Sequence, residues 1–169
     1  MHRFVCGAVI ALAVFGLSAA QAATAPRLSI SSLSELEVPD APFQVNANAD
    51  ADVDAAFARA RRDGKRVMID LGGNWCADCR ILAGLMELPE LRAFLASHYE
   101  LVSVDVGRFD KNLQIPARFG ITARLEGVPA ILVATPQGEL VNPGRISAIE
   151  DARRMTPQAL ADWLAQWTP

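Results

Sequence analysis

Histidine and cysteine, the residues that hold most structural metal ions, are scarce in this chain. Its 169 residues include only two histidines and three cysteines. A structural zinc site typically uses four Cys or His ligands, so a closed site would need a carboxylate or a second chain. Covalent attachment of haem needs a histidine directly after a CxxC pair, where this chain has Arg80. We therefore expect neither a metal ion nor haem.

The chain also lacks an excess of positive charge and a long apolar segment. Its 16 basic and 19 acidic side chains give a formal net charge of −3, which argues against a nucleic-acid surface. Its apolar run, residues 4–17, is shorter than the roughly 20 residues that span a bilayer. We expect no nucleic-acid partner and no membrane span in the mature protein.

Residues 1–22 have the parts of a secretory signal peptide. Arg3 supplies the positive start, residues 4–17 form the apolar run, and Ala-Gln-Ala at 20–22 is a small-x-small cleavage pattern. Cleavage after Ala22 would remove Cys6 and leave two cysteines in an oxidising compartment. We expect a periplasmic or secreted monomer.

The remainder predicts a leader followed by one domain. Residues 23–42 are rich in Ser, Ala and Pro without a sustained period, which predicts a flexible leader. Residues 43–169 can bury one core. Helices are expected at 50–62, 76–88, 89–98, 111–120 and 157–167, and strands at 66–71, 100–106, 129–135 and 139–141. This order predicts an α/β domain whose central mixed β-sheet is flanked by helices on both faces.

Two cysteines, Cys76 and Cys79, lie where a strand gives way to a helix. This spacing puts both side chains on one helix face and permits a disulfide after a small adjustment. A bond closing so small a loop restricts the unfolded chain little, so a structural staple is disfavoured. Cys76, at the helix start, would be the nucleophile because free N–H groups and the helix dipole favour its thiolate. Cys79 would resolve the mixed disulfide.

The residue types around this pair resemble the thioredoxin superfamily. The family motif is a strand followed by Trp-Cys-x-x-Cys and a helix, matched by WCADC at 75–79, with an acid six residues before the first cysteine and Gly-Val-Pro at 127–129. The resemblance covers about residues 43–167. Within the superfamily the chain is most similar to the periplasmic C-terminal domain of the DsbD thiol:disulfide interchange reductases. The resemblance implies a thioredoxin fold and no cofactor other than the redox-active disulfide.

The matching acid is Asp70. The resemblance implies that it is buried and shuttles protons for Cys79. Its position among apolar strand residues would raise the pKa of its carboxyl by desolvation. Two departures stand out: Leu101 replaces the lysine that pairs with this acid in thioredoxins, and the stretch TARLE at 122–126 lengthens the segment before the proline loop.

Substrate backbone is expected to dock on Val128 and on Pro129, whose peptide bond the resemblance implies is cis. Trp75 is expected to form a partly exposed platform beside the sulfurs.

The two residues between the cysteines, Ala77 and Asp78, are expected to tune the redox potential. Asp78 would oppose the Cys76 thiolate, whereas Arg80 would favour it. The sequence leaves the sign of their combined effect open, and we expect a weaker oxidant than the most oxidising family members.

These observations predict an exported thiol–disulfide oxidoreductase of the protein-disulfide reductase type, or an electron relay. Its partners would be protein thiols or disulfides and a redox partner protein. Two alternatives stay open: a thioredoxin-fold binding or chaperone module whose redox pair is incidental, and a reductase dedicated to apocytochrome thiols in cytochrome c maturation.

Overall fold

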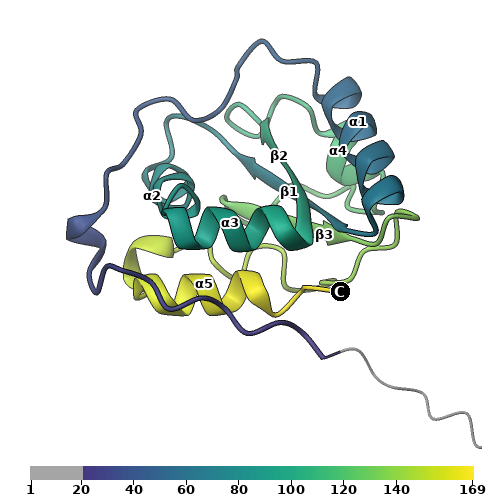
Figure 1. Cartoon of the computed structure of the whole chain (residues 1–169). Coiled ribbons are helices and arrows are strands. Elements are labelled where there is room, and N and C mark those ends of the chain that lie inside the picture. Colours follow the sequence, from purple (N-terminus) through teal and green to yellow (C-terminus); the bar gives the residue numbers. More distant parts are fainter. Residues whose placement is uncertain (1–20) are drawn as a thin grey trace, which may run out of the picture.

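A three-stranded mixed sheet forms the centre of the molecule (Figure 1). The computed structural model describes residues 21–169, so the expected signal peptide lies outside the described residues except for its last two. The strand order is β2-β1-β3: β1 (Arg66–Gly72) runs parallel to β2 (Tyr99–Asp105) and antiparallel to β3 (Ala130–Ala134). The predicted mixed sheet is confirmed.

Helices cover both faces of this sheet, as predicted. The α1 (Ala49–Asp63) and α4 (Gln114–Ala117) helices pack on one face, and α2 (Ala77–Met86), α3 (Pro89–His98) and α5 (Pro157–Ala165) pack on the other (Figure 1). Two short 3₁₀ helices, η1 (Leu33–Glu35) and η2 (Ala152–Arg154), complete the elements. Alternate β1 side chains enter the two cores: Ile69 faces α1 and Met68 faces α3. No helix in residues 21–169 is both long and apolar enough to cross a membrane.

Local signals set the helix ends close to where the sequence predicts them. The Asn48 side chain accepts a hydrogen bond from Ala51 N at the start of α1, and Gly64 ends that helix with a φ of 69°, in the left-handed region that glycine enters without a Cβ clash. Thr156 caps α5 in the same way, with Pro157 in the favoured first turn.

The segment predicted as an edge strand at 139–141 does not form one. The structure has only an isolated bridge between Ala134 and Leu140. The physical reason is Asn142, whose side chain takes the place of strand backbone: its Oδ1 accepts from Val133 N at 2.9 Å and its Nδ2 donates to Ile131 O at 2.8 Å.

The leader expected to be flexible packs against the domain instead. In Figure 1 it passes α5, turns at η1 and runs past α2 before it reaches α1. Leu28 is buried in the core of the α3/α5 face, and its backbone N donates to Gln158 of α5 at 3.1 Å. Its apolar residues, spaced two or three apart, reach that core although their composition gives no helix or strand period.

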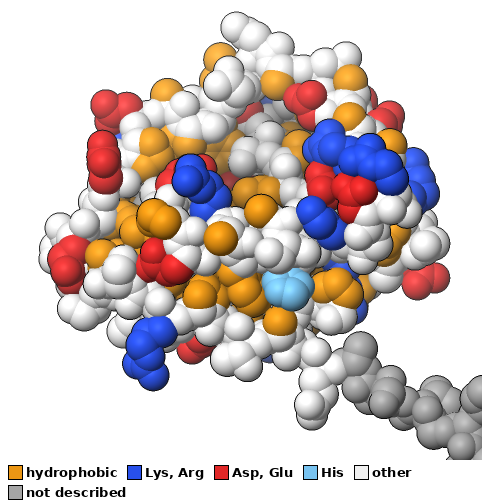
Figure 2. All heavy atoms as spheres, viewed as in Figure 1, with side chains coloured by type: hydrophobic (Ala, Val, Ile, Leu, Met, Phe, Trp, Pro, Cys, Tyr) orange, Lys and Arg blue, Asp and Glu red, His pale blue; other side chains and the backbone are white. Residues whose placement is uncertain are grey.

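The surface seen over α2 and α3 carries no large area of one charge. Figure 2 shows basic and acidic side chains next to one another on this face. At the end of α1, Arg59 Nε lies 2.6 Å from Glu100 Oε2, and Lys65 Nζ lies 3.5 Å from the other oxygen of that carboxylate. These cations of α1 and the following turn are therefore partly neutralised by β2.

Candidate active site

The two cysteines lie at the junction of β1 and α2 and form a disulfide, with their Cα atoms 5.3 Å apart. Cys76 is the N-cap of α2, and its Sγ accepts a hydrogen bond from Cys79 N at 3.1 Å. The helix start predicted for the nucleophile is therefore confirmed. Cys76 is 6% exposed and Cys79 is 0% exposed. The order of access fits the expected roles, but Cys76 lies nearly flush with its surroundings and does not protrude.

The proline loop forms one side of the site. The peptide bond between Val128 and Pro129 is cis, as the resemblance implied. The carbonyl oxygen of Val128 lies 3.4 Å from Cys76 Sγ. A carbonyl this close to the reactive sulfur can accept a hydrogen bond from the Cys76 thiol once the disulfide is reduced.

Trp75, which directly precedes Cys76, also borders the site. Its side chain is 44% exposed, and its Nε1 donates to Gly107 O at 2.6 Å. Because this hydrogen bond fixes the ring while one side stays in solvent, the side chain has the platform geometry that we expected.

A close approach by Cys79 explains a glycine in β1. A Cβ on Gly72 would lie 3.0 Å from Cys79 Sγ and 2.5 Å from a ring carbon of Phe43, so any larger residue would displace one of them. Phe43 is buried here because Asn74 fixes its backbone, accepting from Phe43 N at 2.8 Å and donating to Phe43 O at 2.9 Å. The roles of Phe43 and Asn74 were not predicted from the sequence. The only signal was a polar residue inside the tight turn before the tryptophan.

Asp70 is the buried acid of the site. It is fully buried, and within residues 21–169 neither of its carboxylate oxygens has a hydrogen-bond partner. Burial raises the pKa of this carboxyl to about 7. Side chains two apart on a strand point to the same side, so Asp70 faces the side on which Cys79 approaches Gly72. The Cα partner of Asp70 on β2 is Ser103, so no lysine lies directly opposite it.

The acid between the cysteines is held by a partner far along the chain. Asp78 is buried, and Arg153 of η2 donates several hydrogen bonds to its carboxylate. The donors are the backbone N at 2.8 Å, Nε at 3.0 Å and the guanidinium Nη2. Burial alone raises the pKa of Asp78, but the hydrogen bonds and charge of Arg153 outweigh it, so the net shift is downward.

Arg80, which we expected to act opposite Asp78, points to the leader instead. It donates to Pro39 O at 2.8 Å and to Asp40 Oδ1 at 2.7 Å. The sequence analysis missed Arg153, because a separation of 75 residues gives no local signal. Ala77 is the first residue of α2 and adds no charge.

Comparisons with known proteins agree with this geometry. Residues 48–136 match the family described as Thioredoxin-like. The chain is similar to the thiol:disulfide interchange protein DsbD 1 of Pseudomonas aeruginosa, with 36% identity over 88 residues, or 50% of this chain and 14% of that protein. It is also similar to a thioredoxin of Alicyclobacillus acidocaldarius, with 34% identity over 67 residues, or 40% of this chain and 59% of the thioredoxin.

The chain is also similar to a solved structure, and the match covers nearly the whole of that structure. A crystal structure of a disulphide isomerase from Xylella fastidiosa Temecula1 is 32% identical, with a TM-score of 0.68, and the match covers 73% of this chain and 94% of that one. The two curated relatives, in contrast, are matched over less than two thirds of their own length.

Proposed function

The chain belongs to the thioredoxin-like family, and from this premise we propose that it is a thiol–disulfide oxidoreductase that reduces disulfides in exported proteins. The observation that carries the proposal is the disulfide between Cys76 and Cys79 at the N-terminus of α2. A helix N-terminus favours a thiolate, and Cys76 is the more accessible of the two sulfurs.

The exchange proceeds in two steps. The Cys76 thiolate attacks one sulfur of a substrate disulfide, the substrate S–S bond breaks, and the other substrate sulfur leaves as a thiolate. Cys79 then loses its proton and attacks Cys76 Sγ, which re-forms the protein disulfide and releases the second substrate sulfur. The substrate gains two electrons and the cysteine pair loses two. A redox partner protein that carries a dithiol restores the reduced pair.

Asp70 is the group proposed to take the Cys79 proton. Cys79 is fully buried, so water cannot serve directly. A carboxyl with a pKa of about 7 can accept or return a proton near neutral pH. Val128 and Pro129 would position the substrate backbone beside Cys76, at the site that Trp75 also borders.

The surroundings of Cys76 support the proposed direction of exchange. Its near-complete burial opposes a charged sulfur and so offsets part of the stabilisation that the helix N-terminus gives to the thiolate. The reduced form is therefore weakly stabilised, which supports reduction of substrates. Equilibration with glutathione measures the reduction potential of the cysteine pair. A potential of about −120 mV, the strongly oxidising extreme, would contradict the proposed reductase role.

Export to the periplasm is part of the proposal. It is supported by the signal-peptide pattern of residues 1–22. Fractionation of cells that express the full chain, with N-terminal sequencing of the product, tests export. A cytoplasmic product that starts at Met1 would contradict it.

A covalent trap tests the exchange chemistry. In Cys79→Ser the second step is blocked, so a disulfide-bonded substrate protein should remain attached to Cys76 as an adduct that dithiothreitol releases. The matched control, Cys76→Ser, should form no adduct. If neither variant traps substrate while Cys76→Ser keeps the biological phenotype, a binding or chaperone role replaces the redox role. Recovery of apocytochromes alone would favour dedicated service to cytochrome c maturation.

A further inference from the structure

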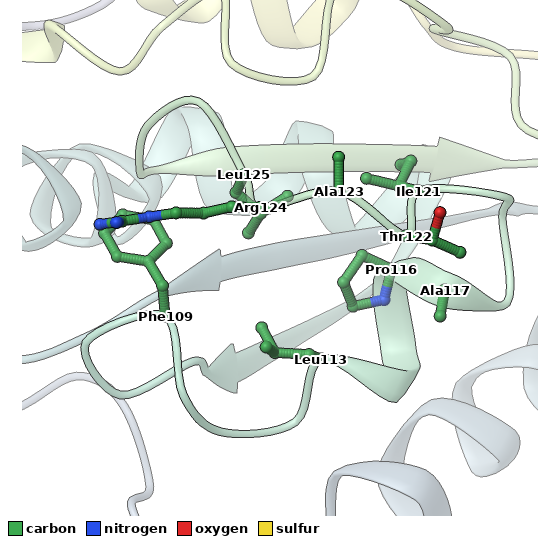
Figure 3. Close-up of a pocket in the computed structure, with 9 residues that line it drawn as sticks. All are labelled: Phe109, Leu113, Pro116, Ala117, Ile121, Thr122, Ala123, Arg124 and Leu125. Carbon is green, nitrogen blue, oxygen red and sulfur yellow. The ribbon is translucent and has the colours of Figure 1, made fainter.

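Four side chains, one of them Trp75 next to Cys76, form a row in which an arginine lies at each end and two aromatic rings lie between. Arg108 Cζ lies 5.0 Å from the centre of the Trp75 ring, and Trp75 meets Phe109 edge-on at 6.1 Å. On the far side, Arg124 Cζ lies 4.6 Å from the centre of the Phe109 ring. Figure 3 shows the Arg124 side chain reaching across to lie over Phe109. We call these four residues the arginine ladder.

The two arginines of the ladder have no acidic partner in the part of the chain that the structure describes: no carboxylate lies within 4.0 Å of either one. The nearest acids along the chain are engaged elsewhere. Asp105 pairs with Lys111, and Asp110 accepts from the backbone N of Arg108. Glu126, the last residue of the insert, lines a second hollow that Arg124 also borders, but it forms no ion pair with Arg124 in the described chain.

Stacking leaves the binding edges of these guanidinium groups open. A guanidinium that lies flat on a ring still presents N–H groups in its own plane, and these match a carboxylate bidentately. Because the rings already hold the two side chains, less conformational entropy is lost when an anion binds.

An apolar pocket of about 280 Å³ adjoins the ladder (Figure 3). Leu113, which is 41% exposed, lies on one side, and the insert that distinguishes this chain from simple thioredoxins lies on the other. Leu125 of that insert belongs to the same buried cluster as Cys76 and Val128. Leu125, which lines this pocket, therefore packs in the same core as the disulfide site.

We propose that the ladder and this pocket together bind the segment of a substrate protein that follows or precedes its reactive cysteine, and that they select acidic segments. An apolar side chain of that segment enters the pocket, and a neighbouring Asp or Glu is bound by Arg108 and Arg124. The occupant is a peptide with a carboxylate because the pocket is apolar while both cations at its edge lack a partner. The inference rests on the proposed exchange activity.

Peptide competition tests this selectivity. Three disulfide-linked peptides differ only at one position, Glu, Gln or Lys, beside a leucine near the cysteine. Reduced wild-type protein should react fastest with the Glu peptide and slowest with the Lys peptide. The two rate constants should differ about tenfold at low salt, and the difference should shrink at about 0.5 M salt.

Two double variants distinguish an effect of the arginine ladder on the rate ratio from an effect of net charge. In Arg108→Gln/Arg124→Gln the Glu-to-Lys rate ratio should fall close to one. Arg27→Gln/Arg61→Gln changes the net charge equally at two exposed positions and should keep the wild-type ratio.

Two outcomes overturn the inference. One is an equal loss of the ratio in both double variants, and the other is a wild-type ratio of one. A ladder variant that changes oligomeric state in sedimentation would assign this surface to a second copy of the chain instead, which also overturns it. If wild-type protein reduces none of the three peptides, that result contradicts the proposed exchange activity itself and not only the selectivity.

Discussion

The carboxyl group of Asp70 is shielded from bulk solvent and has no hydrogen-bond donor within the described chain. Folding therefore raises its pKa from 3.8 to about 7. The folded state holds this proton more tightly than the unfolded state does. Its effect on stability is small below about pH 4, where both states are protonated. It becomes a penalty as the pH rises from 4 to 7.

Replacing Asp70 with Asn should remove this penalty. The gap between 3.8 and about 7 corresponds to about 4 kcal/mol. The free energy of unfolding of oxidised Asp70→Asn should exceed that of wild type by up to this amount at pH 8, and by little at pH 4. Urea unfolding at both pH values measures it. Exposed Asp52→Asn is the control for net charge, and an equal effect of Asp70→Asn at both pH values would contradict the raised pKa.

The same substitution should impair the second exchange step. In wild type, release of the mixed disulfide should accelerate as the pH passes about 7, because Asp70 becomes able to accept the Cys79 proton. In Asp70→Asn this rise should be absent and the rate lower by about tenfold or more. Single-turnover kinetics with a preformed mixed disulfide on Cys76 isolates the step. A normal pH profile in the variant would remove Asp70 from the mechanism.

At the scale of elements, the N-terminus of α2 carries two groups that prefer a negative charge, the Cys76 sulfur and the Asp78 carboxylate. Both lie in the first turn of the helix and so feel the same helix dipole. Arg153 of η2 neutralises the carboxylate, so the Asp78 charge does not cancel the stabilisation of the Cys76 thiolate by the helix dipole. The ion pair also joins the start of α2 to the segment before α5.

Arg153→Gln should uncouple this arrangement. The buried carboxylate of Asp78 would lose its partner, and its charge would then oppose the Cys76 thiolate, so the pKa of the Cys76 thiol should rise. The free energy of unfolding should fall, but by less than for a fully buried pair because the Arg153 side chain is 58% exposed. Thiolate absorbance during pH titration of the reduced protein and urea unfolding measure the two effects.

Neighbouring Arg154 provides the control. It is exposed and lies 3.9 Å from Asp151, so Arg154→Gln should change neither quantity. The double variant Asp78→Asn/Arg153→Gln should recover the thiol pKa, because no uncompensated charge remains. If Arg153→Gln and Arg154→Gln behave alike, the ion pair has no influence on the sulfur.

The elements show where sequence reasoning succeeds and where it fails. Gly64, Pro89 and Thr156 act through their own backbone or side chain, so the helices that they bound were predictable. The missing edge strand and the Arg153 pair depend on side chains that meet only after folding. Asn142 replaces strand backbone through a side-chain amide, and no period in the sequence marks that event.

The same contrast holds for the site and for the whole molecule. Cys76, Cys79 and Asp70 follow from local spacing, since a strand, a turn and a helix place them in order. The packed leader does not, because its contacts are single apolar residues fitted against distant helices. The packed leader leads into Phe43, which lies beside Cys79. The segment after the leader therefore forms part of the disulfide site.

Leu28→Ala tests at this scale whether the leader belongs to the folded core. Leu28 is buried against α5, so its truncation should cost about 2–3 kcal/mol of unfolding free energy and should loosen the leader enough for trypsin to cut after Arg27. Leu101→Ala, at a position that is 38% exposed, should cost less than about 1 kcal/mol and leave Arg27 protected. A mobile leader would instead be cut at Arg27 in wild type, and Leu28→Ala would then be neutral. Because the chain continues from this segment to Phe43, a cut or loosened leader should also change the reactivity of Cys76, which alkylation of the reduced protein would report.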